Sequence, residues 1–387
     1  MRWTMLFILF VVRLAMGYQF QSVASTSDQL ITQFGLSYAQ VGTLIGFFLI
    51  PGIVIAIPSG ALTRAVTDKN LLMAGAAAMA IGALIMGMAG SSDALFIGRL
   101  VTGVGGTLFN LILTKMVSEW FFEREIVLAL SIMLMAWPAG IALGLLTQGP
   151  IAASYGWAWV MFATGIAALL AMVLTAALYR APPVAAQPVG GPLRFALPAR
   201  QFIHMSVVGI VWTLFNATLI VLVSFAPAVL VDAGYEVGAA HSMTSLFMWT
   251  TLISLPLGGR ILGALKSVTP AIVLTMLISA VLIVVLAQGI APVPVAILIG
   301  LVVGLPGGAL MALSAKAVSA SNRGPGLGVF YTWYYVGMTI APGVAGWIRD
   351  QTGQPQAPVL FSASMLLGVV IFVGLLRYLQ SRWPITA

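Results

Sequence analysis

The fold class follows from stretches such as residues 269–289, TPAIVLTMLISAVLIVVLAQG, which contain no charged side chain in 21 positions. At a rise of 1.5 Å per residue, a helix of about 20 residues crosses the ~30 Å hydrocarbon core of a bilayer. Runs of this kind recur along the 387-residue chain, which is 61% hydrophobic and only 7% charged. Soluble domains carry about 25% charged residues. Because backbone groups in lipid must bond internally and no short alternating strands occur, we predict an α-helical membrane bundle.

Hydrophobic runs and turn residues predict twelve transmembrane helices in two sets of six. The first set is predicted at 3–27, 39–62, 70–90, 93–117, 125–148 and 157–179, and the second at 200–230, 239–262, 269–289, 291–318, 327–349 and 357–380. Between the sets, 181–199 is rich in Pro and Gly, which predicts a linker outside the membrane. The predicted organisation is an all-α membrane protein with an N-terminal half, 1–180, and a C-terminal half, 200–387.

The distribution of basic residues predicts the orientation of the chain. With the N-terminus inside, fourteen Lys and Arg residues fall on the inner side and one, Arg349, on the outer side. Inner loops of membrane proteins carry this excess of positive charge. We therefore expect a multi-pass protein of a bacterial cytoplasmic membrane, with both termini and the linker in the cytoplasm.

The two halves resemble weak repeats of each other. The sequence Ile57-Pro58-Ser59-Gly60 at the inner end of the second predicted helix is echoed by Leu255-Pro256-Leu257-Gly258 at the inner end of the eighth. An arginine follows each within four residues, Arg64 and Arg260. Pseudo-symmetric halves of this kind place a substrate site between them near the bilayer midplane.

These features resemble the major facilitator superfamily over essentially the whole chain. The most specific match is Arg99-Leu100-Val101-Thr102-Gly103-Val104-Gly105-Gly106, which is similar to the family's motif in its fourth helix. Trp137-Pro138-Ala139-Gly140 partly matches the fifth-helix motif. The loop signature after the second helix is degenerate, because Arg64 stands at the usual aspartate position. The resemblance implies a transporter with the major facilitator fold that works by alternating access.

Two further stretches resemble the small-anion branches of that superfamily, the cyanate-permease-like and nitrate/nitrite-porter-like proteins. They are Gly35-Leu36-Ser37-Tyr38-Ala39-Gln40-Val41-Gly42 and Ser118-Glu119-Trp120-Phe121-Phe122-Glu123-Arg124-Glu125. The Gly-rich signatures of true nitrate porters are not well matched, so the resemblance does not single out nitrate.

Two arginines fall inside predicted spans, and they are the main candidates for substrate binding. Arg13 lies about ten residues into the first helix and Arg99 about six residues from the outer end of the fourth. A charge at the bilayer centre costs about 2.5–3.5 kcal/mol, and such charges face the bundle interior and serve function. Guanidinium groups lining a cavity match the oxygens of an anion. The alternative for Arg99 is that it orders helix packing by bonding backbone carbonyls.

Other candidate ligands are polar or aromatic side chains within the spans. Asn110 shares a helix face with Arg99, Gly103 and Gly106, although the glycines also suit close helix packing. On the first helix, Tyr18, Gln19 and Gln21 continue polar toward the outer side, where they suit a solvated mouth or a substrate contact equally.

In the second half the candidates are Trp212, Asn216, Tyr331 and Tyr335. Tyr331 and Tyr335 lie one turn apart, so they share a face of the eleventh helix. Aromatic and amide groups opposite a pair of arginines would form a small, selective anion pocket. The alternative is that these aromatic residues form a gate or pack between helices.

The composition argues against several other classes of protein. Cysteine is absent and only His204 and His241 offer imidazole, so we expect no metal and no cofactor. Basic residues are spread singly through short loops, which argues against nucleic-acid binding. No Asp or Glu lies in the interior of a predicted span, so proton coupling through a carboxylate relay is disfavoured.

The leading hypothesis is a monomeric transporter, embedded in the lipid bilayer, of a small anion such as cyanate, nitrite or a small carboxylate. An exporter of hydrophobic neutral or cationic compounds is the alternative, favoured by the Met-rich and aromatic walls. An intramembrane enzyme lacks the required His, Asp and Glu pairs. A transporter-like sensor or scaffold would need a soluble domain, for which no segment is long enough.

Overall fold

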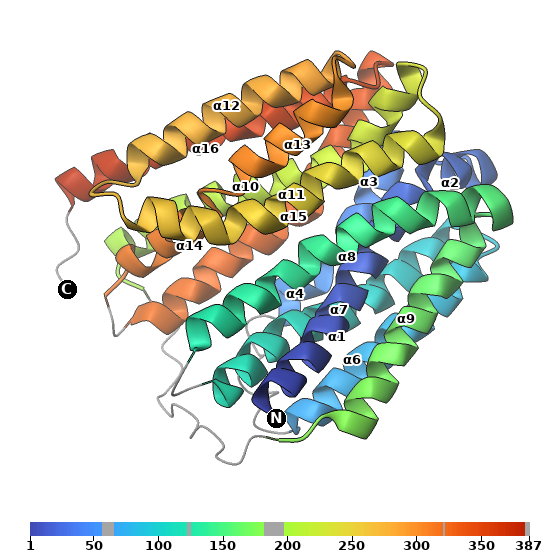
Figure 1. Ribbon diagram of the computed structural model, residues 1–387, viewed down its shortest axis with the longest axis horizontal. Helices are drawn as coiled ribbons and strands as arrows, with labels where there is room; N and C mark the ends of the chain where they lie inside the picture. Colours follow the sequence, from blue (N-terminus) through green and yellow to red (C-terminus); the bar gives the residue numbers. More distant parts are fainter. Residues whose placement is uncertain (56–65, 122–124, 182–196, 320–321, 384–387) are drawn as a thin grey trace. The chain divides into compact units, whose positions relative to one another are not determined.

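The computed structural model describes residues 1–55, 66–121, 125–181, 197–319 and 322–383. The chain divides into two compact units, Met1–Val189 and Gly190–Ala387, here called unit 1 and unit 2. Within the described residues all regular structure is helical (Figure 1). Of the predicted linker at 181–199, residues 182–196 lie outside the described part of the chain.

Unit 1 contains five long helices and three short ones among its described residues. Its helices are α1 (Arg2–Ser25), α2 (Ser27–Phe34), α3 (Tyr38–Phe47), α4 (Ile50–Ile55), α6 (Asp68–Gly87), α7 (Ser92–Trp120), α8 (Ile126–Tyr155) and α9 (Trp157–Leu178). The short α2 was not predicted, and it follows α1 directly after a one-residue break at Thr26. Its last residue is followed by Gly35 at a positive φ of 64°, a conformation that suits glycine and ends the helix.

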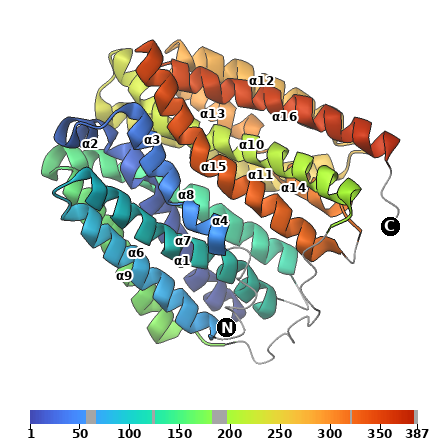
Figure 2. The ribbon, with the colours of Figure 1, turned by 180° about the vertical axis from the view of Figure 1, so that it is seen from behind.

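Unit 2 is likewise built from long helices and short ones. Its elements are α10 (Ala199–Asp232), α11 (Val237–Gly263), α12 (Thr269–Ala287), α13 (Pro292–Val303), α14 (Gly307–Ala312), the 3₁₀ helix η1 (Leu313–Lys316), α15 (Arg323–Thr352) and α16 (Ala357–Arg382). Figure 2 shows α12 and α16 side by side along the unit, as does Figure 1.

The same pairs of helices pack together in both units. In unit 1, α1 packs on α8 and α9, while α6 packs on α7 and α9. In unit 2, α10 packs on α15 and α16, while α12 packs on α13 and α16. The first helix of each set therefore contacts the fifth and sixth, and the third contacts the fourth and sixth. The prediction of two pseudo-symmetric sets of helices is confirmed.

Among the described residues, eleven helical stretches are long and apolar enough to cross a membrane, judged by length and composition. The helix in the position of the remaining predicted span is α15, which has 30 residues. It is less hydrophobic because it is rich in Gly, Tyr and Trp, and because its last turn contains Arg349 and Asp350. The count of twelve spans agrees with these eleven stretches together with α15, and the chain is a multi-pass, all-α membrane protein.

Two predicted helices are broken where proline removes a backbone donor. The span predicted at 39–62 stops at Phe47 and resumes at Ile50, next to Pro51, as α3 and α4. The span predicted at 291–318 is divided into α13, α14 and η1 around Pro306. The predicted motif residues Ile57 to Gly60, together with Leu62 and Arg64, lie outside the described residues.

Candidate functional site

Arg99 lies near the start of α7, and its side chain is fully buried, with 0% of its surface exposed. Its Nε donates to the carbonyl of Leu44 at 3.1 Å, and one terminal nitrogen donates to the carbonyl of Gln19 at 3.2 Å. The other terminal nitrogen donates to the carbonyls of Phe20 at 2.8 Å and Ile45 at 3.4 Å. Each guanidinium nitrogen is therefore bonded to backbone.

Two of these carbonyls, those of Leu44 and Ile45, are available because the second span is broken. Leu44 and Ile45 lie in the last turn of α3, where carbonyl groups have no partner within the helix. The guanidinium also lies over the rings of Phe20 and Phe48, with centroid distances of 5.5 and 4.9 Å. Arg99 thus ties the end of α3 to α1 and α7.

The glycines of α7 serve the same packing. A Cβ atom added to Gly103 would come within 2.6 Å of the Phe48 carbonyl oxygen, and one added to Gly106 within 2.5 Å of the Phe48 ring. The expectation that Arg99 binds an anion directly is not supported, because a fully buried guanidinium whose three nitrogens all donate to backbone carbonyls has no exposed surface for a ligand. Of the two roles that the sequence leaves open, the structure favours the packing role.

Arg13 is in a different position. It is the twelfth residue of the 24-residue α1, about 17 Å from the helix start, and 9% of its surface is exposed. One turn further along, α1 crosses α8 at close range, where a Cβ added to Gly17 would come within 3.2 Å of the Cα of Gly140. Arg13 therefore lies half-way along the mostly buried helix α1, one turn before the close contact of α1 with α8.

The polar residues beyond Arg13 on α1 are buried and bonded within unit 1. Gln19 Nε2 donates to the carbonyl of Met79 on α6 at 2.9 Å. Gln148 Nε2 of α8 donates to the carbonyl of Tyr18 at 2.7 Å. Gln21 Nε2 donates to Ser25 Oγ at 3.3 Å. The idea that Tyr18, Gln19 and Gln21 form a solvated mouth is not supported, because each of these side chains is at most 9% exposed.

Asn110 is half-buried on α7, eleven residues after Arg99. At 1.5 Å per residue the two lie about 16 Å apart along the helix. The structure therefore does not bring Asn110 and Arg99 together into one binding site.

In unit 2, three of the four predicted site residues join one group of aromatic side chains, here called the aromatic cluster. Its members are Trp212, Phe215, Phe330, Tyr331, Tyr334 and Tyr335. Trp212 stacks on Phe330 with a centroid distance of 6.1 Å, and Phe330 contacts Tyr331 at 5.2 Å. The Tyr331 and Tyr335 rings lie 6.4 Å apart, as their one-turn spacing predicts.

The members of the aromatic cluster differ in exposure. Tyr335 is 3% exposed, whereas Tyr331 is 36% exposed. Asn216 lies one turn from Trp212, and its Nδ2 donates to the Trp212 carbonyl at 2.8 Å, which fixes the amide along α10. Phe215 and Phe330 were missed by the sequence analysis, because an apolar ring in an apolar run carries no signal of its own.

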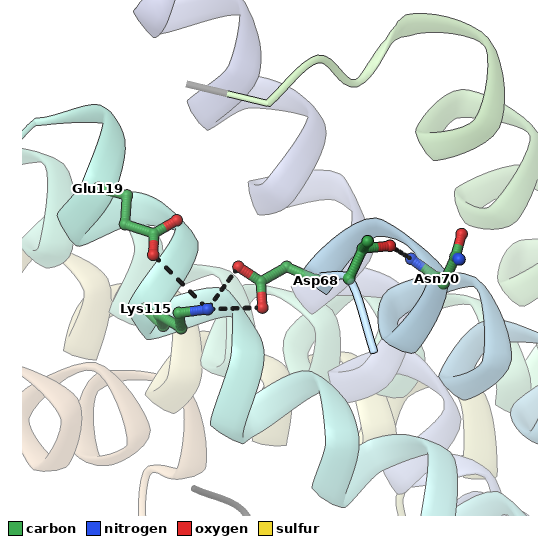
Figure 3. Close-up of polar contacts among 5 residues, drawn as sticks. Asp68, Asn70, Lys115 and Glu119 are labelled. Atoms are coloured by element: carbon green, nitrogen blue, oxygen red, sulfur yellow. Dashed lines mark hydrogen bonds and ion pairs between the residues drawn. The ribbon is translucent and has the colours of Figure 1, made fainter. Parts of the chain in front are cut away.

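An ion triad at one end of unit 1 was also missed (Figure 3). Lys115 Nζ of α7 lies 2.8 Å from both carboxylate oxygens of Asp68, the first residue of α6, and 3.6 Å from Glu119 Oε1. The i, i+4 spacing of Lys115 and Glu119 could have indicated half of this triad. Its other half requires the packing of α6 on α7.

Further contacts fasten the same end of unit 1. Lys69 Nζ donates to the carbonyls of Ala176 at 2.8 Å and Tyr179 at 3.3 Å, at the end of α9. Arg2 forms a 2.7 Å ion pair with Glu125. Burial raises the pKa of the Tyr179 phenol to about 12, so this side chain stays neutral at physiological pH. These contacts hold the ends of α1, α6, α7, α8 and α9 together.

Comparisons with known proteins agree with this helical architecture. The profile of the Major Facilitator Superfamily matches residues 5–238. A search of curated proteins finds no significant match. Among solved structures, the chain is similar to a bacterial homologue of the human lysosomal transporter Spinster, in an inward-facing and occupied conformation. The TM-score is 0.78 at 16% sequence identity, and the match covers 98% of each chain.

The structural match shows a shared fold, and the family match spans more than half of the chain. Members of this family are transporters and not enzymes. The protein belongs to the Major Facilitator Superfamily.

Proposed function

We propose that this transporter moves a small anion across a bacterial cytoplasmic membrane by alternating access, and that Arg13 binds the anion. The observation that carries the proposal is the position of Arg13, buried half-way along the first span. A charge at such a depth costs about 2.5–3.5 kcal/mol, so its presence there requires a compensating role. A guanidinium offers five donors in a planar fork that matches carboxylate-like oxygens.

The contacts of Arg99 sharpen this proposal. Both arginines were candidates, but all three guanidinium nitrogens of Arg99 donate to backbone carbonyls. We therefore propose Arg13, and not Arg99, as the charged ligand of the substrate. A site with a single guanidinium suits a monovalent anion such as cyanate, nitrite or a small carboxylate.

The positions of the acidic residues support an anionic substrate over a cationic one. All eight acidic residues that the structure describes lie in end turns of helices or between helices. A transporter of hydrophobic cations, or one driven by a titrating carboxylate, would use an acid within the span. Uniport, anion exchange and entry of the anion together with a proton are all compatible with this arrangement.

Unit 2 supplies candidate neutral ligands. The aromatic cluster and the Asn216 amide offer ring faces and polar edges near the middle of α10 and in the first half of α15. Tyr331 has the exposure that a ligand contact requires. We propose Trp212, Asn216, Tyr331 and Tyr335 as residues that set the size and shape of the substrate.

The proposal is tested by thermal unfolding of the purified protein with a panel of small anions, cations and neutral solutes. A ligand that binds the folded state raises the apparent melting temperature. We expect one class of monovalent anion to stabilise the protein, and the Arg13→Gln variant to lose the effect. Uptake of that anion into proteoliposomes should fall at least tenfold in the same variant.

The Arg99→Lys variant is the matched control, since it alters an equally buried arginine of the same unit. It should still respond to the anion although its basal stability is lower. If hydrophobic cations alone stabilise the protein, and Arg13→Gln responds to them as the wild type does, then the anion proposal is wrong. The exporter hypothesis then takes its place.

A further inference from the structure

Most basic residues of unit 2 lie at one end and its acidic residues at the other; Arg349, next to Asp350, is a basic residue at the acidic end. Its helices alternate in direction, so α10, α12 and α15 begin at the end where α11 and α16 finish. The described basic residues at this end, here called the basic end, are Arg200, Arg260, Lys266, Lys316, Arg323, Arg377 and Arg382. The only acidic residues of the unit are Asp232, Glu236 and Asp350, and all three lie at the opposite end.

The corresponding end of unit 1 is different, because two of its basic residues have acidic partners. Arg2 pairs with Glu125, and Lys115 pairs with Asp68 and Glu119. The described residues at the basic end of unit 2 include no Asp or Glu with which to form such pairs. Anions from outside the unit can therefore balance its charges.

Two of these charges are held in place by neutral groups. Arg377 Nε donates to Thr269 Oγ1, at the start of α12, at 2.8 Å, and its Nη1 donates to Gln380 Oε1 at 3.3 Å. The guanidinium of Arg382 lies over the Tyr378 ring, 5.8 Å from its centroid. Neutral partners orient a guanidinium without cancelling its charge, so both arginines keep their attraction for an anion.

Lys266 adds a third charge beside them. It precedes Thr269 by three residues, so its Cα is within about 11 Å of the Thr269 Cα by the reach of the chain. We call Lys266, Arg377 and Arg382 the basic patch; all three are exposed. The patch lies at the start of α12 and the end of α16, two helices that lie side by side (Figure 1).

The surface of the same two helices continues from the basic patch as exposed apolar side chains. Leu274 and Val281 of α12 are exposed, as are Ile371 and Leu375 of α16. At the level of the patch, Tyr378 and Trp383 are exposed, and aromatic residues of this kind mark the membrane–water interface. A basic patch, an aromatic band and an apolar surface in this order match the headgroup, interface and acyl chains of a phospholipid.

We propose that the basic patch binds the phosphate headgroup of an anionic phospholipid, whose acyl chains lie along α12 and α16. Charge complementarity favours an anionic over a zwitterionic lipid, because a net negative headgroup supplies the counterion that unit 2 lacks. The apolar surface favours a lipid over free phosphate. This site is independent of the transported anion and of Arg13.

The experiment measures lipid binding to the full chain by native mass spectrometry, with phosphatidylglycerol and phosphatidylcholine in equal amounts. We expect bound phosphatidylglycerol to exceed phosphatidylcholine severalfold in the wild type. Each basic residue near the membrane surface contributes about 1 kcal/mol to the binding of anionic lipid, or roughly fivefold in affinity. The triple variant Lys266→Gln/Arg377→Gln/Arg382→Gln should therefore lose this preference.

The Arg180→Gln variant controls for the loss of an exposed basic residue in unit 1, and it should bind phosphatidylglycerol as the wild type does. Arg377→Lys keeps the charge and should retain most of the binding. Thermal unfolding shows whether the triple variant is folded, and Arg382→Gln alone gives a milder test. The proposal is overturned if the folded triple variant keeps the preference, if phosphatidylcholine binds equally, or if millimolar inorganic phosphate displaces the lipid.

Discussion

Replacing Arg99 with methionine should destabilise unit 1 without removing the response to substrate. In the wild type, the guanidinium satisfies the carbonyls of Leu44 and Ile45 at the end of α3, while those of Gln19 and Phe20 lie within α1. In Arg99→Met the carbonyls of α1 keep their helical partners, but the two at the end of α3 are left buried without donors. Each buried, unsatisfied group costs about 1–3 kcal/mol.

The expected loss follows from these two carbonyls. Together they give about 2–6 kcal/mol, and part of this is offset because methionine no longer buries a charge. We expect a net loss of about 2–4 kcal/mol. For a unit of 189 residues, each kcal/mol lowers the melting temperature by about 2–4 °C, so the drop should be roughly 4–16 °C.

The assay is thermal unfolding of the purified protein in detergent, with and without the stabilising anion. Arg13→Met is the comparison, because it removes the same charge from the same unit. It should keep most of the basal stability and lose the anion response. The reasoning is refuted if Arg99→Met melts as the wild type does, or if it abolishes the anion response at unchanged stability.

Three further predictions follow from contacts within the units. Gly140→Leu should lower the melting temperature by several degrees, because the Cβ atom of the new leucine would collide with the carbonyl oxygen of Leu14 and force α1 away from α8. A variant that melts at the wild-type temperature would contradict this prediction. A double-mutant cycle of Lys115→Met and Asp68→Asn should give a coupling of about 1 kcal/mol, discounted for the partly exposed lysine. A coupling near zero would mean that the ion triad is only a surface contact. Trp212→Ala should weaken the stabilisation by the anion at least fivefold in apparent affinity if the aromatic cluster contacts substrate, whereas an unchanged affinity assigns the cluster to packing alone.

Much of the fold is determined locally, and the sequence therefore predicts it. The length of an apolar run needed to cross a bilayer depends on the helical rise and the bilayer thickness, so most predicted helix ends agree with the described structure to within a few residues. The fifth predicted helix is an exception, because α8 continues to Tyr155. The breaks at Pro51 and Pro306 were not predicted, although each residue was visible in the sequence. Proline is tolerated inside α8 at Pro138 and Pro150, so its presence alone does not show where a membrane helix ends.

The candidate site depended on tertiary structure to a greater extent. The sequence identified Arg13 and Arg99 as the two charges within the spans, because their position along an apolar helix is a one-dimensional property. It could not assign their roles, since the carbonyls that accept from Arg99 are 54 to 80 residues away in the chain. Thr269, which accepts from Arg377, and Asp68, which pairs with Lys115, are likewise distant in sequence, by 108 and 47 residues. The sequence by itself determined a helical membrane transporter with two related halves, and only the folded chain showed that the buried charge of Arg99 is bonded to backbone carbonyls, because hydrogen bonds depend on neighbours in space.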